Sequence, residues 1–276
     1  MKRLPMSNSF LKEIVLGLPN PSNNCWFNAV ITMLIHTFGA FCSLHSNTLL
    51  LESLHPLLNN LTICRSLSAL SLSQLNTSLN FLCSDNSVFT LGQQQDAHEF
   101  FVCLLSNLLY EDYENKNIAE NLKWNDFFDI EINQTVHCLA CSGYCSERVD
   151  TEKQLSLAIG IEKNGSVQEI VDNFFSDEKL NDFVCDHCKN TSSSSIRRRI
   201  SKLPKTLAIS VKRFDNTVKN RQAIYPSSVL ALQKHLGETE STVEPSFYSL
   251  RSIVVHKGLE KKSGHYTSVL MLGDSV

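Results

Sequence analysis

The stretch GLPNPSNNCWFN, residues 17–28, joins a turn rich in proline and asparagine to the start of an apolar segment. From Cys25 onward, apolar residues recur at positions 26, 30, 33, 34 and 38, which is helical spacing. Asn23 and Asn24 are good N-cap residues for this helix. A cysteine at a helix N-terminus meets the positive end of the helix dipole, which favours the reactive thiolate. The stretch therefore predicts that Cys25 is a nucleophile.

A nucleophilic cysteine needs a base, and His265 is the best candidate in the chain. It lies in Ser263-Gly264-His265-Tyr266, ahead of an apolar run that predicts a strand. A neighbouring imidazole stabilises the thiolate and shuttles its proton. Gly264 predicts close approach of a substrate backbone. The alternative is a core cysteine and a structural histidine, because the chain has ten cysteines and nine histidines.

Composition restricts the class of protein. The 276 residues are 42% hydrophobic, enough for one large domain or two closely joined ones. The net charge of −3 gives no reason to expect nucleic-acid or membrane binding. The charged first 16 residues do not resemble a signal peptide, which indicates a reducing compartment, where paired cysteines favour metal binding or catalysis over disulfides. We therefore expect a cytoplasmic or nuclear protein, and a monomer.

The order of expected elements indicates the α+β class, with helices first and a strand-rich region after them. The helices are expected at 25–38, in two short pieces within 49–81, at 94–109 and at 167–175. A linker is expected at 111–120, and polar loops at 191–195 and 237–245. Period-two alternation and short apolar runs predict strands at 127–136, 155–159, 207–211, 252–256 and 266–272.

Two Cys-x-x-Cys pairs lie in the strand-rich region: Cys138 with Cys141, and Cys185 with Cys188. Four thiolates at this spacing suit tetrahedral zinc, here expected at the tip of a β layer that has no core of its own. Two disulfides or four free thiols are the alternative. Other nearby ligands are His137, Cys145 and His187. The basic run at 196–202 favours a solvated strand edge or loop over a partner-binding patch.

Four motifs together resemble the ubiquitin-specific protease family. Residues 17–28 are similar to its cysteine box, and QQDAHEF at 94–100 is similar to its glutamine-aspartate box. LAISVKRF at 207–214 matches a family strand that ends in Arg-Phe, and VHKG at 255–258 followed by GHY at 264–266 matches the histidine box. The motifs occur in the family's order and span residues 17–276.

The resemblance implies a papain-like cysteine protease that cleaves after the C-terminal glycine of ubiquitin. After an N-terminal segment at 1–16, the catalytic domain at 17–276 would comprise a helical thumb at about 17–122, β fingers with a zinc site at about 126–206, and a β-rich palm at about 207–276 that includes strands from the middle region.

By the same resemblance, Cys25 is the nucleophile, His265 the general base and later acid, and Asn20 the oxyanion-hole side chain. Asp96 and Glu99 would face the arginines of the ubiquitin tail, and Tyr266 would bind substrate. Helix capping is the simpler interpretation of the two acids, and turn formation that of Asn20. His98 is expected to be structural, and His256 a neighbour of the site rather than the base.

Two features depart from the family pattern. Ser22 stands where the family has glycine, and the third catalytic residue, Asp or Asn, is expected beyond Val276, because Asp274 fits a hairpin turn better. Two alternatives therefore stay open. One is a ubiquitin-binding protein with weak or no catalysis, and the other is a protease for another ubiquitin-like modifier.

Overall fold

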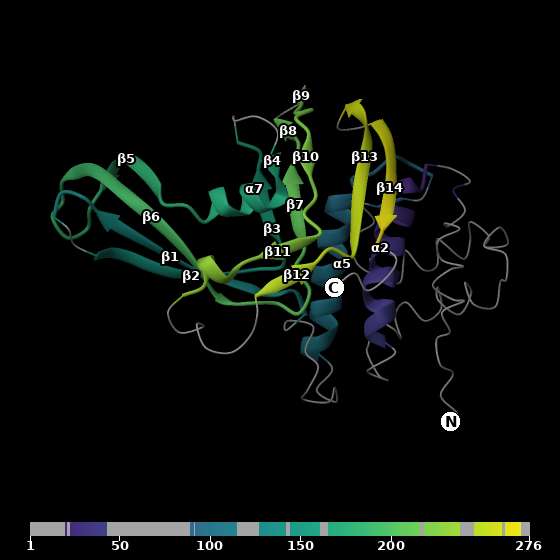
Figure 1. Ribbon diagram of the computed structural model, residues 1–276, viewed down its shortest axis with the longest axis horizontal. Helices are drawn as coiled ribbons and strands as arrows, with labels where there is room; N and C mark the ends of the chain where they lie inside the picture. The colour runs from purple at the N-terminus through teal and green to yellow at the C-terminus, as the bar shows by residue number, and fades with distance from the viewer. Residues whose placement is uncertain are drawn as a thin grey trace. The chain divides into compact units, whose positions relative to one another are not determined.

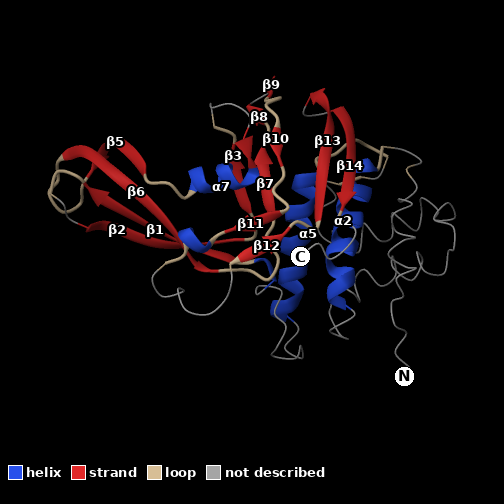
Figure 2. Ribbon diagram, viewed as in Figure 1, coloured by secondary structure: helices blue, strands red, loops and turns tan. Residues whose placement is uncertain are grey.

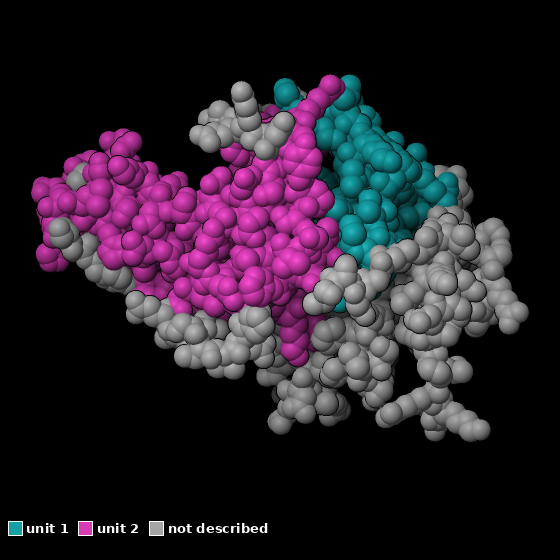
Figure 3. Space-filling model, in the orientation of Figure 1, with its two compact units in different colours: residues 1–123, 216–219, 251–276 teal, residues 124–215, 220–250 magenta. Residues whose placement is uncertain are grey.

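The computed structural model describes residues 20, 23–42, 89–90, 92–114, 127–141, 144–160, 165–215, 218–237, 246–260 and 263–271. It divides into two compact units (Figure 3). Unit 1 comprises residues 1–123, 216–219 and 251–276, and unit 2 comprises residues 124–215 and 220–250. The division into thumb, fingers and palm stays a prediction.

Two long helices and an antiparallel strand pair form most of the described part of unit 1 (Figures 1 and 2). Its elements are α2 (Cys25–Cys42), α5 (Ala97–Glu114), β9 (Val218–Lys219), β13 (Ser252–Glu260) and β14 (Ser263–Leu270). The fully buried Trp26 ring of α2 meets the Phe100 ring of α5 edge-on, with centroids 5.1 Å apart. Burial of these aromatic rings fixes one helix against the other.

The largest sheet of unit 2 is antiparallel, with strand order β2-β1-β6-β5 (Figure 1). Its strands are β1 (Ile130–Cys138), β2 (Tyr144–Glu152), β5 (Glu178–Val184) and β6 (Thr191–Lys202). Leu139, Val149 and Val184 expose more than half of their surface. Val136, Cys138 and Ile196 are buried toward the tip of the same sheet, and the expectation that this layer has no core of its own stays a prediction.

Strand β6 contradicts two expectations. Residues 191–195 are strand rather than loop, and 196–202 continue as an interior strand rather than an edge. Because residues 192–195 are all serine, the sequence shows no alternation of apolar and polar residues there. The structure nevertheless buries Ser194 fully, opposite Cys138. Arg198 and Arg199 donate to the Phe174 and Phe175 carbonyls, so part of the basic run stabilises the end of a helix.

The apolar core of unit 2 lies under short strands and one helix, α7 (Val167–Phe174). Leu157, Val171 and Phe175 are almost completely buried there. The parallel pair β3 (Leu155–Ala158) and β7 (Ile209–Lys212) carries the core residues of two predicted strands. The remaining short elements are β4 (Gly165–Ser166), β8 (Phe214–Asp215), β10 (Ile224–Tyr225), β11 (Val229–Ala231), η2 (Gln233–His235) and β12 (Phe247–Ser249).

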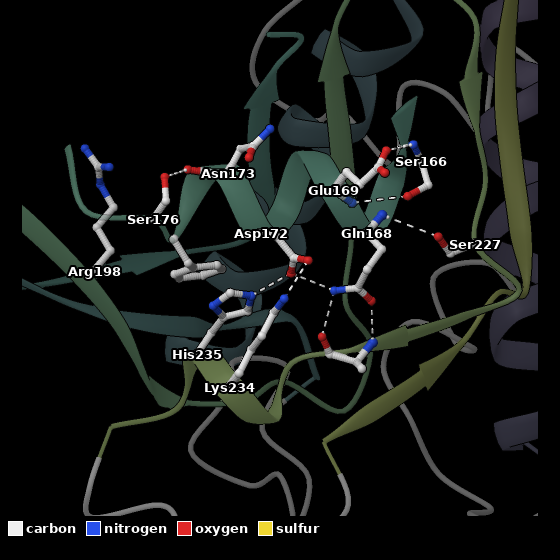
Figure 4. Close-up of polar contacts among 12 residues, drawn as sticks. Ser166, Gln168, Glu169, Asp172, Asn173, Ser176, Arg198, Ser227, Lys234 and His235 are labelled. Carbon is white, nitrogen blue, oxygen red and sulfur yellow. Dashed lines mark hydrogen bonds and ion pairs between the residues drawn. The ribbon is translucent and has the colours of Figure 1, made fainter. Parts of the chain in front are cut away.

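Helix α7 is fixed at its polar face by Asp172 (Figure 4). The carboxylate accepts hydrogen bonds from His235 Nε2 at 2.8 Å, Gln168 Nε2 at 2.8 Å and Lys234 Nζ at 2.7 Å. The buried His235 ring also stacks on Phe175, with centroids 4.8 Å apart. Burial alone would raise the pKa of Asp172, but the hydrogen bonds from Lys234, His235 and Gln168 bring it below its ordinary value.

Most other expected elements are confirmed, with boundaries shifted by a few residues. The predicted linker is helical up to Glu114, and residues 127–128 form a helical turn before β1. The two helices expected within 49–81 lie outside the described residues, as does most of the loop at 237–245. None of the helices in the described ranges is long and apolar enough to cross a membrane.

Candidate active site

Cys25 is the first residue of α2 and is buried, with 7% of its surface exposed. The Asn28 N–H donates to the Asn24 carbonyl at 2.9 Å, so Asn24 stands at the N-cap position, as predicted. Asn23 has a φ of 45°, in the left-handed region that asparagine tolerates better than most residues. This bend leads the chain into the helix at Cys25.

A turn at residues 92–94 holds the segment around Cys25 in place. The Gly92 N–H donates to Asn24 Oδ1 at 2.7 Å, and Asn23 Nδ2 donates to the Gly92 carbonyl at 3.2 Å. Trp26 Nε1 donates to the Gln93 carbonyl at 2.9 Å. Gly92 adopts a φ of 89°, which a side chain would strain. Sequence reasoning identified only a break here and missed its supporting role.

Asn20 is exposed, and its Oδ1 accepts the backbone N–H of Asn24 at 2.7 Å. This hydrogen bond ties the amide group to the chain immediately before Cys25. Asn20, the expected oxyanion-hole residue, therefore lies beside the segment that leads into Cys25, and its Oδ1 points toward the backbone. Ser22, where the sequence departs from the family, lies outside the described residues.

The β13–β14 hairpin carries the histidines and runs along α2. His36 Nε2 is 3.0 Å from the Met271 carbonyl oxygen, and Thr37 Oγ1 is 3.1 Å from Ser252 Oγ. From His36 back to Cys25 the helix rises about 17 Å. From Met271 back to Tyr266 and His265 the strand covers about 17–20 Å. Measured from the contacts of His36 and Thr37, Cys25 and the His265–Tyr266 pair therefore lie at similar distances along the packed helix and strand.

Several candidate site residues affect the pKa of Tyr266. Burial raises the pKa of its phenol to about 12, helped by the nearby Asp96 carboxylate. Smaller contributions in the same direction come from Cys25 and Glu99, and the Ala97 backbone opposes them. These groups are therefore close to the Tyr266 hydroxyl. His265 itself is exposed on β14, opposite Lys257 of β13.

Asp96 is the N-cap of α5. Its Oδ1 accepts the backbone N–H groups of His98 at 2.8 Å and Glu99 at 3.3 Å. The capping interpretation of Asp96 is therefore confirmed. Glu99 and His98 are exposed on the first turn of the helix. Gln94, just before the cap, accepts the Gly264 N–H through its Oε1 at 3.1 Å, a contact with the histidine hairpin that the sequence did not predict.

The four predicted metal ligands converge at the tip of the largest sheet. The sulfurs of Cys138, Cys141, Cys185 and Cys188 all lie within 4.8 Å of one another. Two of the separations are 3.9 Å and 3.8 Å. Ligands at about 2.3 Å on a tetrahedron stand about 3.8 Å apart, so the cluster fits a single metal ion. The cysteines are not disulfide-bonded, which rules out that alternative.

The family model described as ubiquitin carboxyl-terminal hydrolase matches residues 16–275. The chain therefore belongs to the ubiquitin carboxyl-terminal hydrolase family, which confirms the resemblance seen in the sequence motifs.

Curated relatives carry the same family name. The chain is 34% identical over 203 residues to the probable ubiquitin carboxyl-terminal hydrolase 9 of Schizosaccharomyces pombe, covering 70% of this chain and 34% of the relative. It is 27% identical to ubiquitin carboxyl-terminal hydrolase 25 of Arabidopsis thaliana, covering 91% and 41%. The chain thus spans well under half the length of these relatives.

Solved structures share the fold. A chain of the SAGA DUB module of Ubp8, Sgf11, Sus1 and Sgf73, solved with monoubiquitin, matches with a TM-score of 0.76 at 22% identity, covering 99% of this chain and 64% of that one. A second structure of the module, bound to ubiquitin aldehyde, matches with a TM-score of 0.69 at 23% identity, covering 94% and 62%. The expected α+β fold of the family is therefore confirmed.

Proposed function

We propose that the chain is a deubiquitinating cysteine protease that hydrolyses the bond after the C-terminal glycine of ubiquitin. The observation that carries the proposal is that Cys25, at the start of α2, is near enough to Tyr266 of β14 to affect the pKa of its phenol, and His265 is the residue just before Tyr266. Acyl transfer through a thioester requires a thiol nucleophile with an imidazole beside it, and a helix N-terminus favours the thiolate.

In the proposed reaction, His265 takes the proton of Cys25, and the thiolate sulfur bonds to the glycine carbonyl carbon. His265 then gives the proton to the departing amine as the carbon–nitrogen bond breaks. A water molecule, deprotonated by His265, attacks the thioester, and Cys25 leaves as the thiol. Asp274, which the sequence assigns to a hairpin turn rather than to the catalytic triad, lies outside the described residues.

Asn20 stabilises the oxyanion that forms on the glycine carbonyl. Its Oδ1 is occupied by the Asn24 N–H, which leaves the amide Nδ2 to act as the donor. Removal of one such donor costs other hydrolases about 3 kcal/mol of transition-state stabilisation. The hydrogen bond from Asn24 supports this role because it sets the amide's orientation before substrate arrives.

Asp96, Glu99 and Tyr266 bind the C-terminal tail of ubiquitin. Asp96 uses Oδ1 to cap α5, and among the residues that the structure describes its Oδ2 accepts no hydrogen bond. That oxygen and the exposed Glu99 carboxylate suit arginines of a bound tail. The closeness of Asp96 and Tyr266 supports a single binding surface.

The metal in the four-cysteine cluster is zinc. Four thiolates with tetrahedral separations favour Zn²⁺ over harder ions, which prefer oxygen ligands. When bound, the ion would join Cys138 at the end of β1 and Cys141 in the following turn to the Cys185–Cys188 turn between β5 and β6. This role is structural, because all four ligands come from the protein. We further propose that the enzyme acts as a monomer in the cytoplasm or nucleus.

The test uses ubiquitin with a C-terminal vinyl sulfone and the zinc-loaded protein. Wild-type protein gains the mass of one ubiquitin at Cys25, and Cys25→Ala does not react. Cys103→Ala, on α5, is the matched control and reacts like wild type. Ubiquitin that binds but never reacts would replace the proposal with the non-catalytic alternative. Faster reaction with another ubiquitin-like probe would reassign the substrate.

A further inference from the structure

Lys219 of β9 contacts strand β13 of the histidine hairpin. Its Nζ donates to the carbonyl oxygens of His256 and Gly258, both at 2.8 Å, and lies 3.2 Å from His256 Nδ1. A lysine ammonium has three donors and no acceptor, so His256 Nδ1 must be the acceptor. The proton of the neutral His256 ring is therefore on Nε2.

The other side of the His256 ring is enclosed by the facing strand. A Cβ at Gly264 would stand 2.3 Å from His256 Nε2, and Gly264 has a φ of 153°. The ring also hydrogen-bonds the Ser263 backbone and lies against the Tyr266 ring, with centroids 4.7 Å apart. Gly264 thus leaves room for the His256 ring. From the sequence, the same glycine was expected to leave room for a substrate backbone.

The surroundings of His256 disfavour its protonation. Burial lowers the pKa of His256, and the ammonium of Lys219 lowers it further. The Asp96 carboxylate before α5 and the hydrogen bond to Ser263 act in the opposite direction but do not reverse the shift. Across the strands, His256 is paired with Tyr266 and Lys257 with His265, so His256 lies one residue pair from His265.

We propose that Lys219 is a positioning residue that holds β13 at His256 and Gly258 and keeps His256 as the neutral Nε2–H tautomer, so that His265 is the imidazole that takes the proton of Cys25. The functional part rests on the proposed protease activity. Without Lys219, His256 accepts a proton more readily as the pH falls. A charge on His256, whose ring lies against Tyr266, would disturb the β13–β14 pairing that places His265 one residue pair away.

The test compares wild type with Lys219→Met, Lys219→Arg and the distant control Lys179→Met on β5. Imidazole ¹⁵N spectra, recorded from pH 5 to 9 with zinc-loaded protein, report the tautomer and the titration midpoint of His256. Reaction rates with ubiquitin vinyl sulfone are measured over the same range. Should Lys219→Met fail to fold, Lys219→Gln, which keeps N–H donors without the charge, takes its place.

We expect wild type, Lys219→Arg and Lys179→Met to show His256 unprotonated at Nδ1. In Lys219→Met the midpoint rises, and the rate falls about tenfold at pH 6, with a smaller loss at pH 8. An unchanged midpoint, or the same loss at every pH, would overturn the proposal. If wild type forms no adduct, the proposed function fails, while the His256 midpoint still decides the role of Lys219.

Discussion

Replacement of Gly264 by alanine tests the packing behind His265. A Cβ at this position would stand 2.3 Å from His256 Nε2 and 2.6 Å from the Lys257 carbonyl oxygen. The imidazole can rotate, but the carbonyl belongs to the paired strand. To reach ordinary contact at 3.4 Å, the strands must separate by about 0.8 Å (3.4 minus 2.6 Å).

That movement acts on His265 directly, because it is the next residue along the strand. A displacement of about 1 Å of a catalytic group can lower the rate about 10²-fold. The φ of 153° adds strain of about 1–3 kcal/mol for a residue with a side chain. We therefore expect Gly264→Ala to react with ubiquitin vinyl sulfone about 10²-fold more slowly than wild type and to unfold at lower denaturant concentration.

The matched control is Gly160→Ala, because a Cβ at Gly160 meets nothing within 4 Å. This variant should keep the wild-type rate and the wild-type denaturation midpoint. A Gly264→Ala rate within twofold of wild type would show instead that the hairpin tolerates the contact without moving His265.

Three further predictions concern separate parts of the molecule. Asp172→Ala leaves the buried His235 Nε2 without its acceptor and should lower the free energy of unfolding by about 1–3 kcal/mol at pH 7 in denaturant titrations. Because the folded-state pKa of Asp172 is lowered, this loss should be present above about pH 4 and vanish as the pH falls through the folded-state pKa; a constant loss would contradict it. Asn20→Ala should lower kcat for a ubiquitin C-terminal amide about 10²–10³-fold with little change in KM. A rise in KM of the same size with kcat unchanged would show that Asn20 acts in binding instead. Elemental analysis should find one zinc per chain in wild type and in Cys103→Ser but less in Cys185→Ser, and full zinc in Cys185→Ser would exclude the four-cysteine site.

Features built from neighbouring residues could be predicted from the sequence. The helix at Cys25 follows from its apolar spacing and the preceding asparagines, and the two Cys-x-x-Cys pairs each form a local turn. The first part of strand β6 was predicted as a loop because its serines at 192–195 show no apolar alternation, although the sheet buries Ser194 completely. Its burial depends on β1 and β5, which the local sequence does not describe.

The support of the site depends on contacts distant in sequence. Gly92 bonds Asn24 across 68 residues, and Gln94 bonds Gly264 across 170. Lys219 meets His256 from a two-residue strand whose sequence has no distinctive pattern. A motif indicates which residue types a reaction needs, whereas these contacts depend on chain segments that folding alone brings together.

The proposed function requires Cys25 and His265 to form one catalytic pair. The most direct test is steady-state hydrolysis of a ubiquitin C-terminal fluorogenic amide by zinc-loaded wild type, Cys25→Ala, His265→Gln and the control Cys103→Ala. We expect turnover by wild type and Cys103→Ala, and a loss of at least about 10³-fold in kcat for each of the other two. Undiminished turnover by His265→Gln, or by Cys25→Ala, would contradict the account.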